Sequence, residues 1–73
     1  MKALGSSERE IAGYLRGRDA TAGEIARGTN EMLADTCYWL RGMLRDDYVY
    51  ATHTPGHGET RYALTVLGRR MIG

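Results

Sequence analysis

Cysteine and histidine supply the most reactive side chains of this 73-residue sequence, which contains Cys37, His53 and His57. A structural zinc site takes four ligands, and a reactive thiol needs exposure beside a positive charge. Helical spacing puts Cys37 on an apolar helix side, where cysteine acts as a small hydrophobic residue, and the histidines belong to a polar loop. We therefore expect neither a metal site nor a redox sensor.

Catalytic combinations are also missing from the sequence. It has no carboxylate pair suited to one pocket and no nucleophile with an aligned base. The segment "PGHGE" at residues 55–59 is too short for a glycine-rich nucleotide motif. We expect no enzymatic activity and no cofactor.

Overall charge gives no strong indication of a partner. The sequence has ten basic and nine acidic residues and a net charge of +1, whereas DNA-binding domains are often far more basic. Nine of the ten basic residues are arginine, whose planar guanidinium fits phosphates and guanine edges. Arginine content alone is a weak hint.

The expected compartment follows from cysteine content and hydropathy. A single cysteine excludes an intrachain disulfide, which fits a reducing compartment. No run approaches the roughly 20 apolar residues of a membrane span, and the first residues, "MKALGSS", are too short for a secretory signal. We expect a cytoplasmic protein that makes no membrane contact.

The most regular helical pattern lies in residues 31–45, "EMLADTCYWLRGMLR". At about 100° per residue, its apolar side chains cover one broad side, which we expect to be buried with Trp39 as a core anchor. This side comprises Met32, Leu33, Thr36, Cys37, Trp39, Leu40, Met43 and Leu44. The remaining third of the circle displays Glu31, Ala34, Asp35, Tyr38, Arg41, Gly42 and Arg45.

Two shorter helices are expected before this segment. Residues 6–18 show helical spacing of apolar side chains, and Ser7 with Glu10 has the spacing of a capping box. Residues 21–28 repeat that spacing with Thr21 and Glu24. A turn follows, in which Thr29 or Asn30 is expected to cap the next helix.

The C-terminal third predicts a hairpin and a last helix. The runs "DDYVYAT" and "TRYALT" flank the loop "HTPGHGE", which contains one proline and two glycines. Thr65 then has the place of an N-cap for a short helix that contains Val66, Leu67 and Met71. Leu64, at the end of the hairpin, is expected to point inward.

Three segments resemble the winged helix-turn-helix domain of MarR-, ArsR- and PadR-type transcriptional regulators over residues 6–72. "TAGEIARGTN" resembles the second helix and turn, "TCYWLRGMLRDDYVY" the recognition helix and first wing strand, and "RYALTVLGRR" the second wing strand and the sequence after it. The resemblance implies an α+β fold with three helices, a two-stranded β-hairpin wing and a short C-terminal helix, as one domain over residues 1–73.

The sequence departs from this pattern at several points. Asp46 and Asp47 stand where the families place glycine, and Glu31 and Asp35 occupy a helix start that is commonly polar or basic. The long dimerisation helices of MarR-type proteins are missing, so a small-molecule ligand pocket built on them is not expected.

The resemblance implies a small, sequence-specific DNA-binding regulator that acts as a repressor and a homodimer. It places helix 30–45 in the major groove and the wing, residues 50–62, on the backbone or minor groove of double-stranded DNA. The residues implied to contact DNA are Thr21, Ala34, Asp35, Tyr38, Arg41, Arg45, His57 and Arg61.

Other interpretations of the displayed side remain open. Acidic residues at a helix start and arginine at its end also satisfy the helix dipole on a face that is merely solvated. A winged helix can instead bind another regulator through the same face, which the acidic start and low net charge favour. A DNA-architectural or recombination accessory factor is a third possibility.

Overall fold

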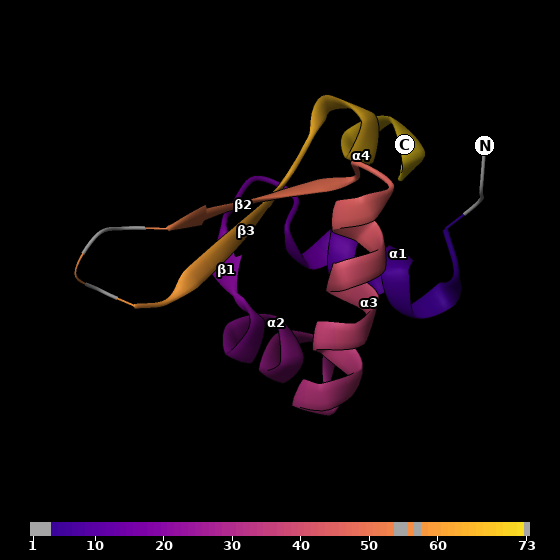
Figure 1. The fold of residues 1–73 in the computed structure, drawn as a ribbon. Coiled ribbons are helices and arrows are strands. Elements are labelled where there is room, and N and C mark those ends of the chain that lie inside the picture. The colour runs from indigo at the N-terminus through magenta and orange to yellow at the C-terminus, as the bar shows by residue number, and fades with distance from the viewer. Residues whose placement is uncertain (1–3, 54–55, 57, 73) are drawn as a thin grey trace.

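The computed structural model describes residues 4–53, 56 and 58–72. Three helices form the body, a hairpin projects from it as a wing, and a fourth helix lies near the end of the third (Figure 1). In chain order the elements are α1 (Ser6–Tyr14), β1 (Ala20–Thr21), α2 (Ala22–Thr29), α3 (Leu33–Arg45), β2 (Val49–His53), β3 (Thr60–Leu64) and α4 (Val66–Met71). The predicted α+β winged helix-turn-helix architecture is confirmed.

Two of the predicted helix caps are present. The Thr21 side chain accepts a hydrogen bond from the Glu24 amide at 3.2 Å, and the Glu24 carboxylate accepts one from the Thr21 amide at 2.9 Å. The Thr65 side chain likewise accepts from the Gly68 amide at 3.0 Å. These bonds satisfy amides that a helix start leaves unpaired.

Two other predicted caps are wrong. Helix α1 begins after Gly5, whose amide donates to the Glu8 carboxylate at 2.9 Å, so Ser7 and Glu10 form no capping box. Asn30 ends α2 in the left-handed conformation with φ 58°, and Met32 precedes α3 without a side-chain cap. Asparagine tolerates this conformation better than most residues, which explains its place in the turn.

The sheet has one more strand than the sequence predicted. Its order is β1-β3-β2, and both pairings are antiparallel. In the hairpin Val49 pairs with Leu64 and His53 with Thr60, while the two-residue strand β1 adds Thr21 opposite Arg61. Because β1 runs directly into α2, this pairing fixes where the second helix starts relative to the wing.

The core lies between the three helices and the base of the wing. Its largest fully buried side chains include Ile11, Leu15, Ile25, Leu40 and Met43. The predicted inward position of Leu64 is confirmed, since it is buried in the same cluster. The core therefore holds α3 by one narrow side and leaves the rest of its surface outside.

Two backbone positions explain how α3, β2 and α4 meet. Asp47, which the sequence places where related domains have glycine, adopts φ 65° in the turn after α3. Its carbonyl accepts a hydrogen bond from the Thr65 hydroxyl at 2.6 Å. A Cβ on Gly68 would lie only 2.1 Å from the Tyr48 carbonyl oxygen, so α4 can pack this closely only because residue 68 lacks a side chain.

Candidate nucleic-acid interface

Helix α3 displays the polar side that the sequence predicted. Tyr38 is 66% exposed, and Ala34, Asp35, Arg41 and Arg45 are also exposed. Because they all belong to one helix, an acidic, an aromatic, a small apolar and two basic side chains share one exposed face. Such a face can contact an elongated partner over several turns.

The predicted burial of the opposite side is only partly correct. Thr36, Leu40 and Met43 are buried, and Trp39 is half-buried against the core. The Thr36 hydroxyl donates to the Met32 carbonyl at 3.0 Å, so its burial leaves no polar group unsatisfied. The core-facing strip of α3 is therefore much narrower than hydropathy alone indicates.

Four apolar residues of α3 and the turn before it are exposed instead of buried. Met32 is 71% exposed and Leu33 55%, and Cys37 and Leu44 are exposed too. For two of them the physical reason is that α2 and the wing approach α3 but leave a hollow of about 420 Å³ between them. Leu33 and Cys37 line this hollow together with Ala22 and Tyr62.

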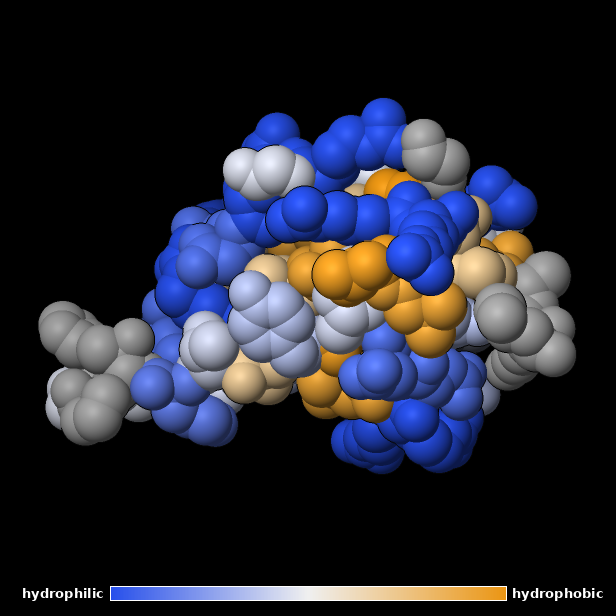
Figure 2. All heavy atoms as spheres, turned by 90° about the horizontal axis from the view of Figure 1, so that it is seen from above, coloured by the Kyte–Doolittle hydropathy of each residue, from blue (hydrophilic) through white to orange (hydrophobic). Residues whose placement is uncertain are grey.

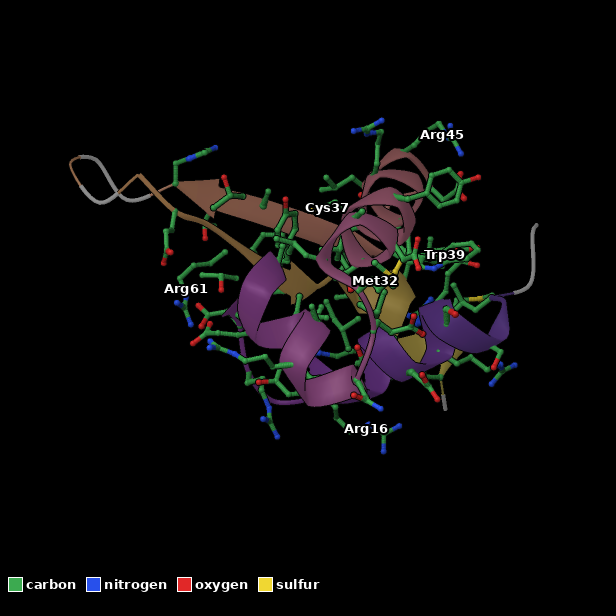
Figure 3. The ribbon with its side chains drawn as sticks, turned by 90° about the horizontal axis from the view of Figure 1, so that it is seen from below. Arg16, Met32, Cys37, Trp39, Arg45 and Arg61 are labelled. Carbon is green, nitrogen blue, oxygen red and sulfur yellow. The ribbon has the colours of Figure 1, made fainter. Side chains whose placement is uncertain are left out.

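Trp39 and Cys37 lie on opposite sides of α3, with Trp39 toward α1 and Cys37 toward the wing strands (Figure 3). The Tyr38 and Trp39 rings make an edge-to-face contact, with centroids 5.0 Å apart. Beside them a second hollow of about 230 Å³ is lined by Glu8, Arg41 and Arg45 as well. Two arginines thus flank an aromatic pair on the side of α3 that faces away from α2.

Arg61 lies on β3 between Thr52 of β2 and Thr21 of β1, and it is engaged within the chain. Its guanidinium contacts the Asp19 carboxylate at 3.2 Å and the Glu24 carboxylate at 3.4 Å. It also donates to the Asp19 carbonyl at 3.2 Å. Because Glu24 caps α2, these contacts connect the wing to the start of that helix. The guanidinium of Arg61, which the sequence predicted to contact DNA, is thus paired within the chain.

The same cluster lowers the pKa of Glu24 below its usual value of 4.5. The main cause is the hydrogen bond that the Thr21 amide donates to the carboxylate, and the positive charge of Arg61 adds to it. Thr21 therefore uses both its amide and its hydroxyl to start α2. As a residue, Thr21 is half-buried at the start of the helix.

The remaining predicted contact residue, His57, lies outside the described residues. On either side of it, β2 and β3 extend away from the body (Figure 1). In the described part of the chain no helix is long and apolar enough to cross a membrane. Nor do residues 4–53, 56 and 58–72 bring three or more His, Cys, Asp or Glu side chains together as metal ligands.

Neither protein-family models nor curated protein sequences match the chain. Solved structures do match in fold. The adhesin competence repressor AdcR of Streptococcus pyogenes is 18% identical, with a TM-score of 0.88 over 94% of this chain and 52% of its own. The zinc-responsive MarR family member ZitR of Lactococcus lactis is 15% identical, with a TM-score of 0.89 over 97% of this chain and 50% of its own.

A mutant of S. aureus MepR bound to an oligodeoxyribonucleotide is also similar, with 18% identity and a TM-score of 0.86 over 94% of this chain and 53% of its own. The chain therefore spans about half the length of these structures. Likeness at this level of identity concerns the backbone. Together with the element order, the three-stranded sheet and the projecting hairpin, it shows that this chain has the winged helix-turn-helix fold found in MarR-type regulators.

Proposed function

We propose that the chain is a sequence-specific transcriptional regulator that binds double-stranded DNA and acts as a repressor. In this proposal α3 enters the major groove and the wing follows the backbone or the minor groove. The observation that carries the proposal is the exposed side of α3, where Ala34, Asp35, Tyr38, Arg41 and Arg45 stand clear of the core. The DNA-bound state of MepR supports it by analogy of fold.

Each proposed contact has a definite chemistry. Arg41 and Arg45 donate to phosphates or to a guanine edge, and Asp35 accepts from a cytosine amino group. Tyr38 contacts a phosphate or a base edge, while Ala34 packs on a thymine methyl. Thr21 and the amides at the start of α2 hold a phosphate. His57 contributes from the wing, and Arg61 is a positioning residue behind it.

The proposed repressor works as a homodimer on a two-fold operator, whose half-sites lie one helical turn apart. Bound there, it blocks access of the polymerase. Sedimentation of the protein with and without operator duplex tests this part separately.

Salt dependence of duplex binding tests the proposal directly. A regulator that neutralises several phosphates loses affinity steeply with salt, with a slope of about −0.9 per phosphate contact in a plot of log K against log salt. Alanine at Arg41 or Arg45 should reduce that slope. Arg16 is the charge-matched control, because it lies on the side of the molecule opposite Arg45 (Figure 3). A flat salt dependence, or no binding to duplex DNA at low salt, contradicts the proposal.

A second candidate is a protein-binding winged helix that uses the same face. The acidic group of Asp35 on that face and the net charge of only +1 favour it, and the apolar side chains of Met32 and Leu33 are exposed beside the face. Its partner would be another regulator, and its affinity would depend weakly on salt. The duplex titration therefore separates the two candidates in a single experiment.

A further inference from the structure

The start of α3 carries an apolar surface that the core does not use. It consists of Met32, Leu33 and Cys37, which are all exposed, and Cys37 lies toward the wing strands (Figure 3). Leu33 and Cys37 line the hollow of about 420 Å³ between α2, α3 and the wing. We call these three residues the apolar start of α3. Contact between these apolar side chains and water is unfavourable. A partner that covers them therefore binds with a more favourable free energy.

Charge on the two flanks of this surface indicates the chemistry of the partner. Arg27 lines the hollow from α2, and Arg41 is exposed one helical turn beyond Cys37. Between residues 31 and 40 there is no lysine or arginine, but there are two carboxylates, Glu31 and Asp35. The protein surface thus has apolar side chains between two arginines. The major groove of DNA has the complementary arrangement, with base edges that carry apolar groups between two phosphate backbones.

We propose that the apolar start of α3 recognises thymine methyl groups in the major groove, so that this protein selects sites by methyl contacts at the helix start. The proposal rests on the proposed function as a DNA-binding regulator. In the major groove the C5-methyl of thymine is the one apolar group among the base edges, and small or apolar side chains contact it. Recognition of guanine by arginine is then confined to the later turns of α3.

The position of these residues along α3 supports contact with thymine methyl groups rather than general apolar binding. A helix that enters the groove points its first turns at the base edges; Leu33 is the first residue of α3, and Met32 is its N-cap. Cys37 follows Leu33 after one turn, so the two side chains present a short line along the helix. This line can meet the methyl groups of neighbouring base pairs. By helical spacing, Asp35 and Glu31 lie off the line that Leu33 and Cys37 make.

The experiment compares thymine with uracil in the same duplex. A high-affinity duplex is first selected from a random pool with the whole chain. Each thymine is then replaced singly by deoxyuridine, which removes one methyl group and leaves the hydrogen-bonding edge intact. At contacted positions affinity should fall about fourfold for each methyl removed. Positions outside the contact should show no change.

Variants assign that loss to the protein. Leu33→Ala and Met32→Ala should each bind the thymine duplex more weakly and should lose the difference between thymine and uracil at one contacted position. Both side chains are exposed, so the variants should fold, which circular dichroism checks. Val66→Ala is the matched control, since Val66 is 68% exposed but belongs to α4, near the other end of α3. It should keep the full difference.

Each outcome decides the matter. Equal affinity for every thymine and uracil duplex overturns the methyl contact while tight binding itself upholds the proposed function. A difference that survives unchanged in Leu33→Ala and in Met32→Ala also overturns it. Failure to select any duplex overturns the inference and the proposed function together.

Discussion

Replacing Gly68 with alanine should destabilise the protein, although alanine favours helices more than glycine. The added Cβ would lie 2.1 Å from the Tyr48 carbonyl oxygen and 3.1 Å from the Leu64 Cδ2 atom. The carbonyl belongs to the backbone and already accepts a hydrogen bond from the Thr65 amide at 3.0 Å. To make room, α4 must move away from the start of β2 and weaken that bond.

The expected size of this effect follows from three contributions. Overpacking of a rigid site costs about 1–3 kcal/mol, and the weakened hydrogen bond adds up to about 1 kcal/mol. The helix preference of alanine offsets about 1 kcal/mol at most. We expect the free energy of unfolding to fall by about 2 kcal/mol, which for a domain of this size lowers the Tm by roughly 10 °C.

Urea denaturation followed by circular dichroism measures the change. The control is Gly13→Ala in α1, where a Cβ would meet nothing within 4 Å. That substitution should raise the free energy of unfolding by about 1 kcal/mol. If Gly68→Ala is as stable as the parent while Gly13→Ala behaves as expected, the close approach of α4 to the turn before β2 is refuted.

Further predictions concern the turn after α3, the start of α2 and the displayed face. Asp47→Gly should leave the free energy of unfolding equal or higher, whereas Asp47→Val should lower it by about 1 kcal/mol in urea denaturation, because a β-branched residue resists positive φ. The lowered pKa of Glu24 contributes stability above pH 4.5 that is lost as the pH falls through the folded-state pKa. Glu24→Gln should therefore make the stability less sensitive to acid below pH 4.5, and an unchanged acid dependence in denaturant titrations would count against the Thr21 amide contact. Arg41→Ala should weaken binding to a selected duplex by about 1–3 kcal/mol, as measured by fluorescence anisotropy, while Arg16→Ala should bind within twofold of the parent.

Local signals in the sequence were sufficient for most of the elements. The spacing of Thr21 and Glu24 and the place of Thr65 predicted two helix starts, because a cap is made by residues within one turn of each other. The hairpin followed from two strand-like runs around a proline- and glycine-containing loop. The sequence did not predict strand β1, because two residues are too few to show the alternation of apolar and polar side chains that marks a strand. The strand is defined by its pairing with β3.

The candidate site was harder to predict because exposure depends on neighbouring elements. Hydropathy assigned Met32, Leu33 and Cys37 to the core, yet all three are exposed, and Leu33 and Cys37 line an open hollow between α2, α3 and the wing. Figure 2 shows the upper face, near α4, where apolar atoms also reach the surface among hydrophilic ones. Nothing in the spacing of Arg61 indicated that Asp19, 42 residues earlier, would hold its guanidinium.

The measurement that tests the account most directly is an amide titration of the ¹⁵N-labelled protein with its selected duplex. We expect the largest shifts along α3, at the start of α2 around Thr21, and in the hairpin between β2 and β3. Helix α4 and the segment around Arg16 should show small shifts. Shifts centred on α4 and Arg16 with α3 unaffected would contradict the claim that the displayed side of α3 is the DNA-binding surface.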